Sequence, residues 1–81
     1  MELDLQADLN AEDDEGFNWG LVRNAANPGL LRRGAVLRAG SAASWSWIVV
    51  VRVDPDGQVH FRQISASEAK RKLSARRSVE A

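Results

Sequence analysis

The chain has 81 residues, eleven of them basic and eleven acidic, and it contains no cysteine. A chain of this length folds as one small domain, and the absence of thiols excludes disulfides, thiolate metal centres and cysteine nucleophiles. Its longest apolar run, Trp47–Val51, is far shorter than the ~20 residues that cross a bilayer, and the acidic N-terminus does not resemble a secretory signal. We therefore expect a cytoplasmic protein with no membrane partner.

The zero net charge hides a strong asymmetry along the chain. Residues 1–16 contain seven acidic residues and no basic one, whereas residues 17–81 contain all eleven basic residues and four acidic ones. Acids at helical spacing repel one another, and the leucines are too few to offset the entropy cost of ordering sixteen residues. We predict a disordered acidic arm over residues 1–16, with docking of Leu3 and Leu5 as a short strand as the alternative.

Residues 17–64 are predicted to form a small β domain. Apolar side chains alternate at Phe17, Trp19 and Leu21, a pattern that favours a short strand or an extended segment. The Asn-Pro-Gly sequence that follows indicates a turn, and Ala35–Ala39 is a strand candidate with a glycine on each side. A loop of small residues then leads into the next strand.

A β-hairpin is predicted over residues 46–64. Its Asp-Pro-Asp-Gly sequence at 54–57 suits a type I turn followed by a left-handed glycine bulge. This turn pairs Val53 with Val59, Val51 with Phe61, Arg52 with His60 and Ile48 with Ile64. The pairing predicts a core face made of Val49, Val51, Val53, Val59 and Phe61, and an opposite cationic row made of Arg52, His60 and Arg62. A one-residue slip would place Val49 opposite Arg62 and is disfavoured.

The C-terminal segment is predicted to be a basic helix over residues 65–77, with a frayed tail at 78–81. Ser65 and Glu68 have the spacing of a capping box, and Glu68 lies four residues before Lys72, in the favourable order for an ion pair. The positive charges of the helix come from Lys70, Arg71, Lys72, Arg76 and Arg77. Such a face can bind phosphates, dock the acidic arm of the same chain, or simply be solvated.

Few residues carry the chemistry of an active site. His60 is the single histidine, and the predicted register places it at the sheet surface opposite Arg52, where no carboxylate orients it as a general base. We interpret His60 as an ordinary surface histidine. The turn at 54–57 lacks the ligands of a calcium loop, and the acidic run at 12–15 is interpreted as a solvated segment. No cofactor or metal is predicted.

Three tryptophans in so short a chain suggest either core filling or an aromatic platform beside arginines. We expect at least one of Trp45 and Trp47 to lie in the core. The candidate binding surface consists of Arg38, Arg52, His60, Arg62, Trp45 and Trp19.

Arg33–Leu37, Ser44–Val51 and Asp56–Val59 together resemble an SH3-like small barrel, in which a glycine precedes the first strand and a loop leads to a long hairpin. The whole chain is also similar to short actinobacterial proteins of unknown function, which implies no activity. The expected fold is mainly β: a small bent antiparallel sheet or an SH3-like partly open barrel with a C-terminal helix. Such barrels host many roles, so the resemblance does not select one.

Three functions follow as hypotheses. The leading one is a non-catalytic interaction module that binds a protein partner. The second is nucleic-acid binding by the basic residues, with the acidic arm as an inhibitor. The remote third is an enzyme that uses His60. A homodimer is also open, because Ile48 and Val50 need cover either from the C-terminal helix or from a second copy of the chain.

Overall fold

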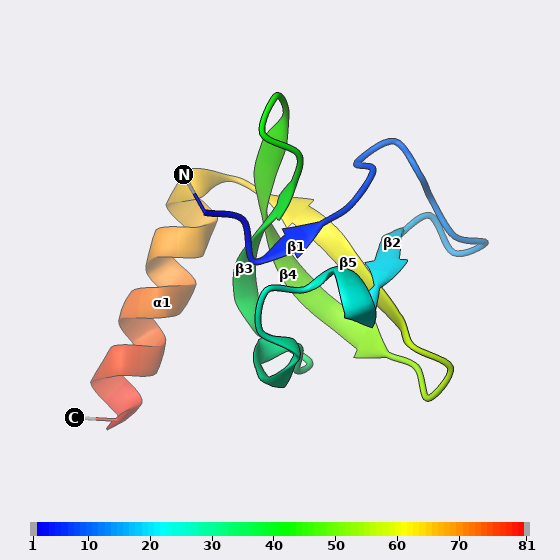
Figure 1. Ribbon diagram of the computed structural model, residues 1–81. Helices are drawn as coiled ribbons and strands as arrows, with labels where there is room; N and C mark the ends of the chain where they lie inside the picture. Colours follow the sequence, from blue (N-terminus) through cyan, green and yellow to red (C-terminus); the bar gives the residue numbers. More distant parts are fainter. Residues whose placement is uncertain (1, 81) are drawn as a thin grey trace.

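The computed structural model describes the backbone of residues 2–80 and the side chains of residues 2–75 (Figure 1). Five strands form one sheet: β1 (Leu5–Gln6), β2 (Asn18–Leu21), β3 (Val36–Gly40), β4 (Trp45–Val53) and β5 (Gln58–Ile64). Two 3-10 turns, Val22–Asn24 and Pro28–Leu30, connect β2 to β3, and the helix α1 (Ala66–Glu80) follows β5. The helix therefore extends beyond residue 77.

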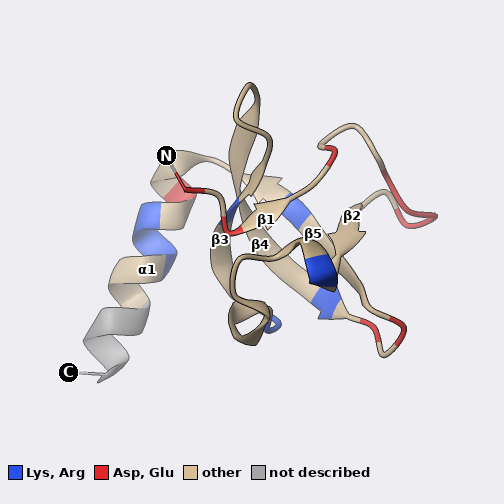
Figure 2. Ribbon diagram, in the orientation of Figure 1, with Lys and Arg blue, Asp and Glu red and all other residues tan. Residues whose placement is uncertain are grey.

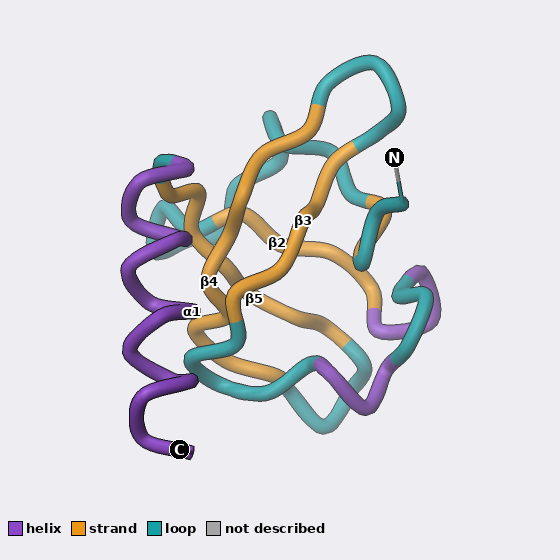
Figure 3. Tube along the Cα trace, turned by 90° about the vertical axis from the view of Figure 1, so that its left-hand side faces the viewer, coloured by secondary structure: helices purple, strands orange, loops and turns teal. Residues whose placement is uncertain are grey.

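The sheet has the strand order β1-β3-β4-β5-β2, with β1 parallel to β3 and all other pairs antiparallel. It curls until its two edges approach each other, and α1 lies along one side (Figures 1 and 3). The fold is thus a mainly β, nearly closed barrel with one C-terminal helix, as predicted. Among the described residues, no helix has the length and apolar character needed to cross a membrane.

The N-terminal segment closes the barrel instead of forming a disordered arm. Leu5 is completely buried and forms a bridge with Ala25, and the carbonyl of Asp4 accepts a hydrogen bond of 3.0 Å from the amide of Ala26. Gly20 of β2 lies beside Leu5, since a Cβ atom added at Gly20 would be in ordinary van der Waals contact with Leu5 Cδ2 at 3.6 Å. The prediction of a disordered arm is wrong here, because one fully buried leucine and backbone pairing to β3 offset the cost of ordering.

The turn of the predicted hairpin is confirmed. Gly57 has φ 92°, its amide donates to the carbonyl of Asp54 at 3.1 Å, and Val53 lies opposite Val59. The register then shifts at a bulge between Val50 and Arg52, which the sequence did not indicate.

This bulge changes the pairing before it. Arg52 lies opposite His60 as predicted, but Phe61 faces Val50 instead of Val51. Ile48 faces Gln63 instead of Ile64, and Val49 lies opposite Arg62, the pairing that we had disfavoured. Bulges increase local twist and bend a strand, which a curled sheet needs.

The bulge also reverses which residues of β4 face the core. Ile48 and Val50 pack inside the barrel with Phe61 and other buried residues, whereas Val49 lies on the outer face beneath α1. The predicted core face of β4 is therefore wrong, and Val53 is 38% exposed. Because Ile48 and Val50 are already covered, they supply no reason for a homodimer.

The short strand expected around residues 17–21 is present as β2. Asn18 and Gly20 face inward, and Trp19 and Leu21 are half-buried on the other side. The buried Asn18 amide donates to the carbonyls of Leu9 and Ala11 at 2.8 and 3.0 Å, which satisfies its polar group and fixes the incoming chain.

The helix begins as the capping box predicts. The Ser65 hydroxyl accepts a hydrogen bond of 3.0 Å from the amide of Glu68. The Glu68 carboxylate, however, accepts from Arg62 at 3.0 Å and lies 3.8 Å from Lys72. Ala69 packs against the outer face of the sheet and is almost fully buried, so α1 attaches by a small apolar contact.

Candidate functional site

The six residues of the candidate binding surface lie on the outer face of the sheet, but they do not form one cluster. Side chains of directly opposed residues share a face of a sheet. Trp19 and Arg52 both lie opposite His60, and Arg38 lies opposite Trp47. Trp45 and Arg62 join them by strand alternation, two residues from Trp47 and His60. The helix α1 crosses this face at Val49 and Ile64, which divides it into a Trp19–Arg52–His60 end and a Trp45–Arg38 end.

His60 lies between two carboxylates at the first of these ends. Its Nδ1 is 2.6 Å from Asp13 Oδ2, its Nε2 is 2.8 Å from Asp54 Oδ2, and the residue is only 4% exposed. The prediction of a surface histidine is therefore wrong. Each ring nitrogen lies within hydrogen-bond distance of a carboxylate oxygen of the chain, so both nitrogens are already engaged. Neither nitrogen is left to take a proton from a substrate.

Asp13 reaches His60 because it builds the turn that precedes β2. Its Oδ1 accepts hydrogen bonds from the amides of Glu15 at 2.8 Å and Phe17 at 2.9 Å. Gly16 supplies φ 86°, a left-handed conformation that tightens the turn. The other carboxylate oxygen of Asp13, Oδ2, points to the outer face, where it meets His60. The residue types around Asp13 are compatible with an Asx-type turn, which is a local feature. They do not indicate that Asp13 contacts His60, 47 residues further along the chain.

The carboxylates of this cluster titrate below their ordinary range. Burial on its own would raise the pKa of Asp13, but hydrogen bonds from His60 and from two amides of its own turn outweigh it and lower the pKa. For Asp54, the hydrogen bond from His60 is the largest cause of a lowered pKa. Burial opposes this shift, and a hydrogen bond from Arg52 adds to it. Both aspartates are thus ionised at neutral pH.

The remaining cations of the predicted row also have internal partners. Arg52 Nη1 lies 3.0 Å from Glu15 Oε1 and its Nε lies 2.7 Å from Asp54 Oδ1; these two contacts raise the pKa of Arg52. Arg62 is paired with Glu68. Figure 2 shows the acidic residues gathered in the loop before β2 and in the β4–β5 turn. The acidic segment therefore docks on the hairpin through its carboxylates.

A hollow of about 380 Å³ opens beside this cluster. Trp19 and Gln58 form part of its wall, and the charged lining residues are Asp13, Asp14, Glu15, Arg52, Asp54 and His60. No group of three acidic or histidine side chains within the described residues is arranged to hold a metal ion.

The second end of the outer face is accessible and aromatic. Trp45 is 36% exposed, and its ring meets that of Trp47 edge-on, with centroids 6.0 Å apart and an interplanar angle of 73°. The guanidinium of Arg38 lies 5.7 Å from the centroid of Trp47. Trp47 is half-buried against the apolar contact under α1, and Trp45 lies outside both apolar clusters of the described residues.

The basic helix does not hold the acidic segment in the described part of the chain. Lys70 and Arg71 are exposed, and Lys72 lies near Glu68. The side chains of Arg76 and Arg77 lie outside the described residues.

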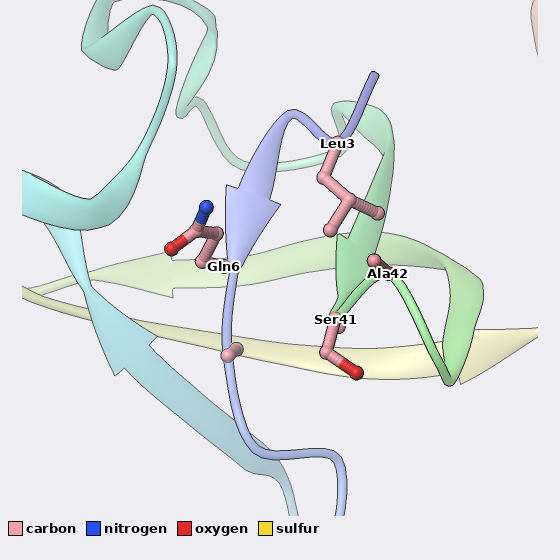
Figure 4. A pocket seen from close by; sticks show the side chains of 6 residues that line it. Leu3, Gln6, Ser41 and Ala42 are labelled. Carbon is pink, nitrogen blue, oxygen red and sulfur yellow. The ribbon is translucent and has the colours of Figure 1, made fainter. Parts of the chain in front are cut away.

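Another hollow, of about 530 Å³, lies between β1 and the loop after β3. Figure 4 shows Leu3, Ser41 and Ala42 on one side of β1 and Gln6 on the other. Gly40 has φ 133° there, and a side chain at this position would clash with the Ser44 carbonyl. Among the described residues, none with a charged side chain lines this hollow, so they offer little to orient a ligand.

Acid should weaken the His60 cluster. The pKa values of Asp13 and Asp54 are lower in the folded chain than the ~3.9 of an unperturbed aspartate. The stability that these two carboxylates give the fold is therefore complete at pH values above the unfolded-state pKa. It is lost as the pH falls through their pKa values in the folded chain. We expect the wild-type Tm to fall between about pH 5 and pH 2, and the fall to be shallower for Asp54→Asn. Thermal melts across this range test the prediction, and identical pH profiles would contradict it.

Comparisons with known proteins do not assign a family. No protein-family model matches the chain, and neither a curated protein nor a solved structure matches it.

Proposed function

We propose that this chain is a non-catalytic, protein-binding module, built as an SH3-like small barrel, that binds its partner through the outer face of the sheet. The accessible contact surface is the Trp45 end, made of Trp45, Trp47 and Arg38. The cytoplasmic location expected from the sequence belongs to the same proposal.

The edge-on pair made of the exposed Trp45 and the half-buried Trp47 carries this proposal. Large aromatic rings and arginine are the side chains most enriched at the energetic centres of protein interfaces. Trp45 lies on a strand of the sheet and contacts the ring of Trp47, which in turn lies near the Arg38 guanidinium. These contacts restrain Trp45 before binding, so its apolar surface can meet a partner with a small loss of side-chain conformational entropy.

The alternatives have less support. An enzyme would need a free nitrogen on His60, and both are bonded to carboxylates. Nucleic-acid binding would need free cations, and Arg52 and Arg62 already contact acidic side chains. The remaining support for it comes from basic side chains that are exposed and form no ion pair among the described residues: Arg23, Arg32, Arg33, Lys70 and Arg71.

The proposal predicts a specific loss of capture by Trp45→Ala. Truncating a central aromatic residue of an interface costs at least about 2 kcal/mol, or roughly thirtyfold in affinity. The matched control is Val53→Ala, which removes a similarly exposed apolar side chain outside the Trp45 end. The immobilised proteins are incubated with nuclease-treated lysate of the source cells, and the captured proteins are identified. The proposal expects proteins retained by wild type and Val53→Ala but lost by Trp45→Ala. Equal capture by all three proteins would overturn it.

A further inference from the structure

The Arg52–His60 end of the outer face carries two nitrogen-bearing side chains that one carboxylate orients before any ligand arrives. Asp54 accepts from Arg52 Nε with one oxygen and from His60 Nε2 with the other. This leaves His60 Nδ1 and Arg52 Nη1 pointing to the same side. A carboxylate that bonds one nitrogen of each side chain fixes the direction of the remaining nitrogens, and such a site is preorganised.

Two carboxylates of the chain itself fill these remaining donor positions. Asp13 Oδ2 lies 2.6 Å from His60 Nδ1, and Glu15 Oε1 accepts a hydrogen bond of 3.0 Å from Arg52 Nη1. They are two residues apart in the sequence. Trp19 lies opposite His60 on the neighbouring strand and lines the same hollow. The turn at 13–16 therefore behaves as an acidic peptide ligand bound in cis.

The chain on both sides of the turn is held by contacts that involve neither Arg52 nor His60, among them the bridge between Glu12 and Asn18. The chain before it is held independently: Leu5 is in the core, and Asn18 bonds the carbonyls of Leu9 and Ala11. Glu15 and Arg52 are about half exposed, so their pair is weak. The docked state benefits from the short tether, which sets an effective concentration in the millimolar range.

We propose that Arg52 and His60, oriented by Asp54, form a docking site for an acidic segment of a protein partner with two carboxylates at positions i and i+2, and that the turn at 13–16 occupies this site until such a segment displaces it. The proposal rests on the proposed protein-binding function, and it adds the chemistry of the ligand and an internal competitor.

The test uses a fluorescein-labelled peptide with the sequence of residues 8–17, added to the full-length chain. In the open variant, Asp13→Asn with Glu15→Gln, both internal carboxylates are neutral amides. The control variant, Glu12→Gln with Asp14→Asn, changes the net charge by the same amount in the same segment but removes no ion pair or hydrogen bond found in the described structure. Circular dichroism checks that each variant is folded. If the open variant does not fold, the single variant Glu15→Gln replaces it, since Glu15 is exposed.

Fluorescence anisotropy should show the open variant binding the peptide at least about tenfold more tightly than wild type or the control variant. Adding Arg52→Gln to the open variant should abolish binding, and a peptide with amides in place of the carboxylates at the positions of Asp13 and Glu15 should not bind. Equal binding by open and control variants, or no binding by the open variant, would overturn the proposal. Tighter binding of a twelve-nucleotide oligothymidylate than of the peptide would also overturn it and assign the site to phosphates. Because every protein in this test keeps Trp45, its failure leaves the Trp45 proposal untouched.

Discussion

Replacing Leu5 by alanine should destabilise the whole barrel, by about 3 kcal/mol, which for a domain of this size lowers Tm by about 10–20 °C. Leu5 is completely buried in the main core, where it approaches Gly20 of β2 and forms a bridge with Ala25. Truncation leaves a cavity at the place where the two edges of the sheet meet. Thermal and urea denaturation of the variant measure the loss.

The matched control for this change is Leu30→Ala, which makes the same chemical substitution at a leucine that is 45% exposed. Its expected effect is within about 0.5 kcal/mol. If Leu5→Ala were as mild as Leu30→Ala, the N-terminal segment would not be part of the core, and the disordered arm predicted from the sequence would be the better description.

Removing the His60 ring should be the second large effect. His60→Ala deletes two hydrogen bonds to charged groups and leaves two carboxylates facing an empty space, so we expect a loss of about 2–3 kcal/mol at neutral pH. Urea denaturation at pH 7 measures it. The loss should shrink at acid pH, where the carboxylates are protonated and the wild type no longer benefits from the contact.

A double-mutant cycle separates this contact from a general packing defect. His60→Ala and Asp13→Asn remove the same interaction, so the double variant should lose less stability than the two single variants added together. His60→Ala paired with Glu12→Gln is the control, because no contact joins these two residues in the described structure. Additive losses in both cycles would show that the His60–Asp13 contact does not stabilise the fold.

Local patterns predicted the features of this fold that depend on neighbouring residues. The Asp-Pro-Asp-Gly turn, the pairing of Arg52 with His60 beside it and the capping hydroxyl of Ser65 are all as expected. Each is fixed within a few residues of the chain, where turn and cap preferences act. The mainly β fold with a C-terminal helix followed from the same signals.

The features that the sequence did not indicate depend on contacts between distant segments. The bulge near Val51 lies in an apolar run, where no polar alternation marks the change of register, and it exchanged the faces of β4. The charge asymmetry suggested that the acidic segment could dock on the basic body. The acidic segment docks on Arg52 and His60 and not on the helix. This follows from the three-dimensional placement of the turn, which precedes these two residues by 37 to 47 positions in the chain.

The proposed docking site on the outer face depends on one observation, that the acidic turn at 13–16 is docked on Arg52 and His60. NMR relaxation of the backbone amides measures this docked state most directly. For residues 13–15 of the wild type at pH 7, we expect order parameters near those of rigid backbone, about 0.85. In the open variant, Asp13→Asn with Glu15→Gln, we expect values below about 0.6 for the same residues. Order parameters below about 0.6 in the wild type itself would contradict the account.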